Sequence, residues 1–307
     1  MAAPGGRWRL IAATVAFLLW APLVLVGLPL AVLLLLGRAA PAADGRTAAR
    51  SSVAIALGVA ALSAATVPLL PGGLVGSVYA AVSVLLAAAL AVLALLGPAP
   101  FWTLALRSTA AALVSLAVLA RAFWGRDWLA SLQWEATRQA QEGARAFIWV
   151  LPDLRPGFDA VASFIGTTLP ATLALQCLAA LALAWTLHGR LALHPVGAPL
   201  RPFREFRMGD AWVWVLVGTL AVWLLGRAAL AQNLAVLVGT LYFLQGAAVA
   251  GALASALGIS TVALVVISIL AAPFAAILIP GLCTLGVTDT WLQYRRRIAA
   301  RADRPHQ

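Results

Sequence analysis

The sequence predicts an all-α membrane protein, a bundle of about eight transmembrane helices with one interfacial amphipathic helix. Two observations support this fold class. Hydrophobic residues make up 63% of the 307 residues and charged residues only 10%, whereas about 25% of residues are charged in soluble domains. The hydrophobic residues also gather in stretches of roughly 20, the helix length that crosses a hydrocarbon core about 30 Å thick. The composition excludes a disordered chain and a large water-soluble catalytic domain.

Eight stretches are long enough to be spans. Their backbone must be helical, because peptide groups that face lipid find no other hydrogen-bond partners. Short connections, such as Pro71-Gly72-Gly73 and Gly258-Ile259, predict that successive spans run antiparallel. The stretches are residues 10–36, 52–70, 74–96, 101–120, 159–187, 211–231, 234–257 and 260–287.

The first and last stretches each leave an alternative open. The small residues at 39–43 resemble a signal-peptide cleavage site, but the apolar run before them is about twice as long as a secretory apolar region. We expect an uncleaved first span, kinked near Pro22 and Pro29. The last stretch contains Pro273 and Pro280, so it is either one kinked helix or a broken one.

The longest connection, residues 121–158, carries five arginines, four acidic residues and four tryptophans. Its centre, from about Asp127 to Phe147, lacks proline and predicts a helix whose tryptophans lie at the membrane interface. We therefore divide the chain into an N-terminal span and loop (1–50), a membrane domain (51–297) that contains this insert, and a disordered cytoplasmic tail (298–307).

All 21 basic residues are arginine, and the net charge is +11. They lie in loops and at the ends of apolar stretches, which favours contact with lipid head groups over nucleic-acid binding. With eight spans, 13 arginines fall on the side of the N-terminus and 8 on the other side, which includes Arg201, Arg204 and Arg207. Because arginine is enriched in cytoplasmic loops, we expect both termini in the cytoplasm.

Motifs of membrane enzymes and metal sites are missing from the sequence. It has no HExxH, no GxSxG, no Walker lysine and no paired carboxylates within a span. Cys177 and Cys283 lie in separate apolar stretches without a CxxC pattern. We expect no enzymatic activity, no cofactor and no bound metal.

Polar residues of the seventh stretch are candidate ligand-binding residues. Polar side chains in a span usually face the bundle interior, either as interhelical hydrogen-bonding groups or as groups that line a cavity. Both readings stay open for these residues, which are Asn233, Thr240, Tyr242 and Gln245.

Asp289 lies near the end of the last stretch, where a carboxylate needs a cation or the membrane interface. Its candidate partner is Arg227, which the eight-span arrangement places on the same side of the membrane. Trp291, Arg204 and Arg207 are candidates for structural or partner contacts, since aromatic and basic residues mark interfaces.

The order of these motifs resembles the YybS-like family of uncharacterised bacterial multi-pass membrane proteins. The resemblance is strongest in the last hundred residues and extends over roughly residues 50–297. It implies a protein of the bacterial inner membrane, with a layout similar to that of the substrate-binding components of energy-coupling-factor transporters. It is carried by Phe203 to Asp210 before a Trp-rich span, Asn233, Tyr242-Phe-Leu-Gln-Gly246 and Leu285-Gly-x-x-Asp289-x-Trp291-x-x-Tyr-Arg295.

Two functions of different classes follow from these observations. The first is a transport-type membrane component that binds a small solute between its helices. Because the sequence has no nucleotide-binding loop, an ATP-driven version would need other transporter subunits. The alternative is a membrane scaffold or partner-binding protein without a ligand.

Overall fold

The computed structural model describes residues 24–36, 73–96, 99–150, 153, 155–192 and 197–295. These residues are mainly helical, as predicted, and contain no strand. They form two compact units, Met1–Leu200 and Arg201–Gln307, and each unit is described by itself. The predicted span 52–70 and the predicted tail 298–307 lie outside the described residues.

Five helices in the described part of the chain are long and apolar enough to cross a membrane. They support the prediction of a helical membrane protein but not the count of eight spans. Of the remaining predicted spans, the first is described only as α2 (Val24–Leu36) and the sixth contains just 14 helical residues, α9 (Ala211–Leu224). The five helices are α4 (Gly73–Leu96), α5 (Phe101–Trp124), α8 (Leu169–Leu191), α10 (Ala228–Ala256) and α12 (Ala275–Leu292).

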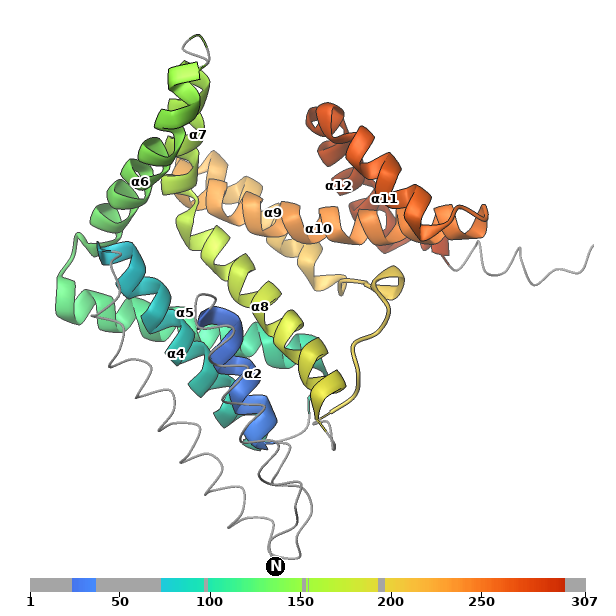
Figure 1. The fold of residues 1–307 in the computed structure, drawn as a ribbon, viewed down its shortest axis with the longest axis horizontal. Helices are drawn as coiled ribbons and strands as arrows, with labels where there is room; N and C mark the ends of the chain where they lie inside the picture. The colour runs from blue at the N-terminus through green and yellow to red at the C-terminus, as the bar shows by residue number, and fades with distance from the viewer. Residues whose placement is uncertain are drawn as a thin grey trace, which may run out of the picture. The chain divides into compact units, whose positions relative to one another are not determined.

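The first unit is a bundle of α2, α4, α5 and α8 (Figure 1). Its core consists of aliphatic side chains from all four helices, including Leu30, Leu86, Leu104 and Leu181. Burial of such side chains from several helices holds the bundle together through close packing.

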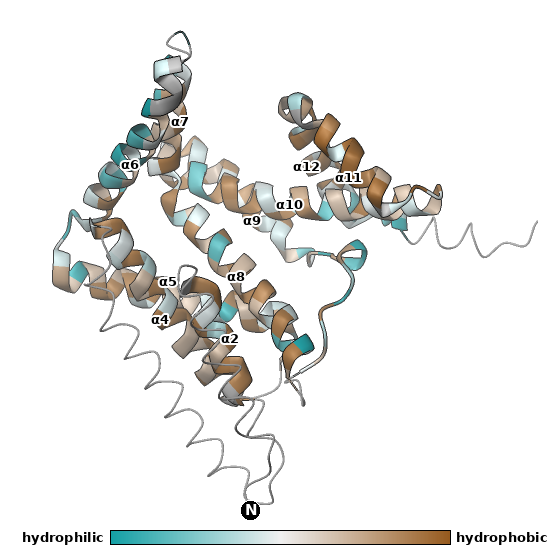
Figure 2. Ribbon diagram, in the orientation of Figure 1, coloured by the Kyte–Doolittle hydropathy of each residue, from teal (hydrophilic) through white to brown (hydrophobic). Residues whose placement is uncertain are grey.

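The helix predicted in the insert, from about Asp127 to Phe147, is confirmed, and it forms a helical hairpin with the helix that follows it. The hairpin consists of α6 (Trp128–Val150) and α7 (Arg155–Thr167). At their crossing, a Cβ on Gly166 would overlap the Thr137 hydroxyl and lie 2.7 Å from the carbonyl oxygen of Gln133. Figure 2 shows hydrophilic residues along α6, as its mixture of charges and tryptophans predicts.

The predicted span 159–187 is therefore wrong at its start, because the helix is interrupted at Thr168 between α7 and α8. Pro170 explains the interruption. Its nitrogen carries no hydrogen to donate to the carbonyl of Gly166, and its ring would crowd that carbonyl.

Glu135 of α6 ties the hairpin to the bundle. Its Oε2 accepts a hydrogen bond of 3.0 Å from the backbone N–H of Leu74, in the first turn of α4. The first N–H groups of a helix have no partner within the helix, and a carboxylate there also meets the positive end of the helix dipole. The hairpin therefore lies at the end of the bundle where α4 begins.

In the second unit, α9 and α10 pack against each other around a tight turn at Leu225–Arg227. Gly226 has a φ of +73°, a conformation that glycine adopts without the steric cost of a Cβ. The turn corrects two predicted boundaries, since the sixth span ends at Leu224 rather than 231 and the seventh begins at Ala228 rather than 234.

The last predicted span is broken. It consists of α11 (Thr261–Leu270), a short 3₁₀ turn η5 (Ala272–Phe274), and α12. Pro273 lies in the turn, where it lacks the N–H that a continuous helix would direct to Ile269. Of the two alternatives left open by the sequence, the broken helix is the one observed.

The helices α10 and α12 cross each other with their chains running in the same general direction. Three contacts between them join residues with the same separation of 44 in the sequence, namely Gly239 with Cys283, Tyr242 with Gly286, and Gln245 with Asp289. An antiparallel pair would have separations that change along the helices. The segment 257–274 must therefore return along α10 before α12 begins, as Figure 1 shows for α11.

Candidate functional site

A buried polar network lies where α10, α12 and the loop before α9 meet. At its centre is Asp289, whose side chain is 2% exposed. Its Oδ2 accepts hydrogen bonds from Arg295 Nη2 at 2.7 Å and from Gln245 Nε2 at 3.4 Å, and its Oδ1 accepts one from the Tyr294 N–H at 3.1 Å. The partner of Asp289 is thus Arg295, and the predicted pair with Arg227 is wrong.

Arg295 also reaches the loop that precedes α9. Its Nη1 donates to the backbone carbonyl oxygens of Arg204 and Phe206, each at 2.9 Å. This loop contains a short 3₁₀ helix, η4 (Phe203–Glu205), whose Phe203 ring stacks on Phe206 with centroids 6.3 Å apart. One guanidinium group therefore links the end of α12 to the loop.

These contacts also correct the predicted topology. The eight-span arrangement placed Arg204 and Arg295 on opposite sides of the membrane. Because they are in direct contact, the loop 201–210 and the end of α12 lie on one side. Arg227 lies beyond the other end of α9, which explains why it is not the partner of Asp289.

Gln245 completes the network from α10. Its Oε1 accepts a hydrogen bond of 3.0 Å from the backbone N–H of Met208, and its Nε2 donates to the Gly286 carbonyl oxygen at 3.0 Å. Gln245 is fully buried, so both ends of its amide are used within the protein. Its role in the structure is that of an interhelical hydrogen-bonding group.

Two glycines allow α10 and α12 to approach closely enough for this network. A Cβ on Gly246 would overlap the carbonyl oxygen of Leu282, and a Cβ on Gly286 would overlap that of Tyr242. Small residues at such crossings let helix backbones come together in membranes. Gly246 and Gly286 were visible in the sequence motifs, but nothing there indicated that they meet.

The other predicted ligand residues are not gathered into one site. Asn233 is half-buried and donates a hydrogen bond to the Ala229 carbonyl oxygen of its own helix at 2.9 Å. Thr240 is half-buried, whereas Tyr242 is fully buried. The Tyr242 hydroxyl has no hydrogen-bond partner among the residues that the structure describes.

The predicted contact residues Arg204, Arg207 and Trp291 are accessible within the second unit. Arg207 Nη2 lies 3.8 Å from Asp210 Oδ1, in an exposed pair. Trp291 is 62% exposed near the end of α12. Like Phe203, they belong to the basic and aromatic residue types expected at a membrane interface.

A groove between α9 and α10 is the candidate binding site. Its volume is about 690 Å³, within the range of roughly 300–1,000 Å³ that small-molecule sites occupy. None of the predicted ligand residues lines it. Those residues were predicted because they are polar, whereas most residues that line the groove are apolar. The lining residues are Leu216, Val217, Thr219, Leu220, Trp223, Ala228, Ala231, Gln232 and Ala235.

Two polar side chains lie among these apolar residues. The Thr219 hydroxyl donates to the Val215 carbonyl oxygen of its own helix at 2.8 Å. The Gln232 amide forms no hydrogen bond with the described residues and is half-buried. It is therefore the group in the groove that is able to bond a polar atom of a bound molecule.

No protein-family model, curated protein or solved structure significantly matches the chain.

Proposed function

We propose that the chain is a transport-type component of the bacterial cytoplasmic membrane that binds a small, mainly apolar solute between α9 and α10. The main support for this proposal is the groove between these two helices. Its volume suits a small molecule, and its apolar lining around one available amide, Gln232, is the usual composition of a ligand site. The polar network would position the groove by fixing the loop before α9 to α10 and α12.

The orientation of the second unit is part of the proposal. Eight of the nine arginines in residues 201–307 belong to the loop 201–210 or to the chain from Arg295 onward. The contact between Arg295 and Arg204 supports one membrane face for the loop 201–210 and the end of α12, with Arg227 at the opposite face. Such asymmetry favours a cytoplasmic loop and C-terminus. The cytoplasmic N-terminus stays a prediction.

Membership of the YybS-like family is proposed on the same residues. Three of the four sequence features that carry the resemblance contain Phe206, Gln245 and Asp289, which are joined through one network. By analogy with energy-coupling-factor transporters, we propose that a partner subunit would supply the energy for transport. No catalytic step is assigned to this chain.

Solute binding is tested by purifying the protein in lipid nanodiscs and identifying co-purified small molecules by mass spectrometry. Ala235→Trp fills the groove, and Ala229→Trp adds the same ring at an exposed position that does not line it. The groove variant should lose the co-purified molecule, and the control should keep it. Retention of the same molecule by both variants would remove the groove as its site.

One observation favours the alternative, a partner-binding scaffold. Trp134 and Trp149 on α6 are 66% and 90% exposed, and Arg138 lies over the Trp134 ring at 5.3 Å. Exposed tryptophan and arginine are the residues that dominate protein interfaces. Cross-linking from position 149 to another membrane protein, with no solute found in the groove, would support this function instead.

A further inference from the structure

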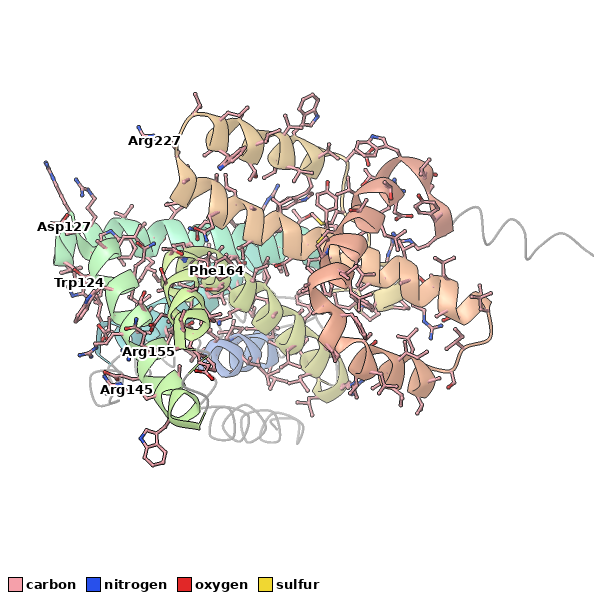
Figure 3. All side chains as sticks on the ribbon, turned by 90° about the horizontal axis from the view of Figure 1, so that it is seen from above. Trp124, Asp127, Arg145, Arg155, Phe164 and Arg227 are labelled. Atoms are coloured by element: carbon pink, nitrogen blue, oxygen red, sulfur yellow. The ribbon has the colours of Figure 1, made fainter. Side chains whose placement is uncertain are left out.

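An isolated positive charge lies in the turn between α9 and α10, next to the groove. Between Asp210 and Asp289 the sequence has a single charged residue, Arg227. It is exposed in the turn between α9 and α10 (Figure 3) and has no ion-pair partner among the described residues. Trp223 and Ala228, which flank this turn, both line the groove. A cation therefore lies next to an apolar groove.

From this arrangement we propose that the solute is a single-chain amphipathic anion, a fatty-acid-like carboxylate. This inference rests on the proposed function and names the chemical class of its solute. The carboxylate would lie at Arg227, and the alkyl chain would lie along the groove toward Leu216. Charge complementarity selects an anion, since the residues from 211 to 288 contain no acidic residue that would attract a cation.

Trp223 and Arg227 also support binding with the carboxylate at the turn and the alkyl chain along the groove. Trp223 is 61% exposed beside the turn, and tryptophan and arginine together mark the head-group level of a bilayer. A carboxylate bound at Arg227 would stay at this level, and the alkyl chain would extend into the hydrocarbon region. Gln232 lies between these two regions, where its amide can donate to the second carboxylate oxygen or to an oxygen on the chain.

The volume of the groove favours a bound molecule with a single alkyl chain. At about 690 Å³ the groove has the size of a site for one small molecule. A diacyl phospholipid has two chains and a larger head group, and would occupy the groove only in part. The proposed occupant is therefore a free single-chain anion rather than a membrane phospholipid.

The test uses dodecanoate carrying a diazirine as a photoreactive probe, with its neutral methyl ester as the matched compound. The full chain in phosphatidylcholine nanodiscs is irradiated with each probe, and labelled peptides are mapped by mass spectrometry. We expect the carboxylate to label α9 and α10 near Trp223 and Ala228. Unlabelled dodecanoate should compete, whereas added phosphatidylglycerol should not.

Three variants separate the charge from the groove. Arg227→Gln should lower labelling by the carboxylate about threefold and leave the ester unchanged. This change corresponds to about 0.7 kcal/mol, which is within the range of exposed ion pairs. Arg201→Gln removes an exposed arginine of the loop at the other end of α9 and should change neither. Ala235→Trp should abolish labelling by both probes.

Each other result is decisive. If Ala235→Trp blocks both probes and Arg227→Gln affects neither, the groove binds a solute but the anionic head is wrong. If phosphatidylglycerol competes as well as dodecanoate, the occupant is bulk lipid and the inference fails. If neither probe labels α9 or α10, the inference fails, and the co-purification experiment decides the proposed function independently.

Discussion

Arg295 lies six residues after Asp289, and its Nη2 donates to the Asp289 carboxylate at 2.7 Å, although Asp289 is in the last turn of α12 and Arg295 follows the end of that helix. In a continuous helix these residues would be one and two-thirds turns apart and would not face each other. α12 ends at Leu292, and Gln293 adopts a left-handed conformation with φ 48°. The chain therefore turns, and the guanidinium group reaches back to the carboxylate.

Removing either charge of this pair should destabilise the second unit. Asp289→Asn or Arg295→Gln leaves a largely buried charge without its partner, at a cost of about 2 kcal/mol or more. The double variant should recover part of this loss, with a coupling energy of about 1–3 kcal/mol. Thermal unfolding in a mild detergent measures the cycle.

The matched control is the pair Arg207–Asp210, which is exposed and 3.8 Å apart. Its cycle should show a coupling energy of about 0.5 kcal/mol or less. Additive effects of Asp289→Asn and Arg295→Gln would mean that the contact does not stabilise the protein.

Gln245→Leu should cost about 1–3 kcal/mol, because it leaves the Met208 N–H and the Gly286 carbonyl without their buried partner. Any loss of solute binding should be indirect, since Gln245 does not line the groove but holds the loop before α9. Ser268→Ala removes an exposed hydroxyl bonded to its own helix and serves as the control. A ligand that stabilises wild type but not the Gln245 variant would show that Gln245 contributes to binding.

Gly246→Ala and Gly286→Ala should each separate α10 from α12, because the added methyl group would overlap a backbone carbonyl of the other helix. We expect a loss of about 2 kcal/mol or more for each. Gly251→Ala on α10 and Gly281→Ala on α12 meet nothing within 4 Å and should stay within about 1 kcal/mol of wild type. Equal stability of all four variants would exclude a close crossing at Gly246 and Gly286.

Glu135→Ala should loosen the attachment of α6 to α4. It removes the acceptor of the Leu74 N–H, and loss of such a cap costs about 1 kcal/mol. Hydrogen exchange should become faster in the first turn of α4. Glu142→Ala, which removes an exposed partner of Arg138 at 3.8 Å, should leave that exchange unchanged. Unaltered exchange in the Glu135 variant would contradict the capping role.

The sequence predicted the helices better than their directions. Apolar runs of about 20 residues identify spans because lipid leaves the backbone no alternative, and Pro273 correctly indicated a possible break. The length of an apolar stretch does not show that Pro170 interrupts a helix at Thr168. It also does not show that the stretch after Gly258 forms two helices, α11 and α12, with a turn between them. The relative direction of α10 and α12 was for this reason not predicted.

The sequence likewise identified some residues of the candidate site and missed others. The sequence identified Gln245 and Asp289 as unusual, because polar residues in apolar stretches are costly without partners. It did not identify Arg295 as the partner, since the turn at Gln293 depends on where α12 ends. It also did not indicate the groove, because apolar lining residues such as Leu220 look like any other residue of a span.

The short helices of the second unit have a consequence for the bilayer itself. α9 has 14 residues and α12 has 18, so at about 1.5 Å per residue they are about 21 and 27 Å long. Both are shorter than a hydrocarbon core about 30 Å thick, and such hydrophobic mismatch is relieved by thinning of the surrounding lipid. The lipid next to α9 and α12 should therefore be thinner than the lipid next to α10, whose 29 residues extend about 44 Å.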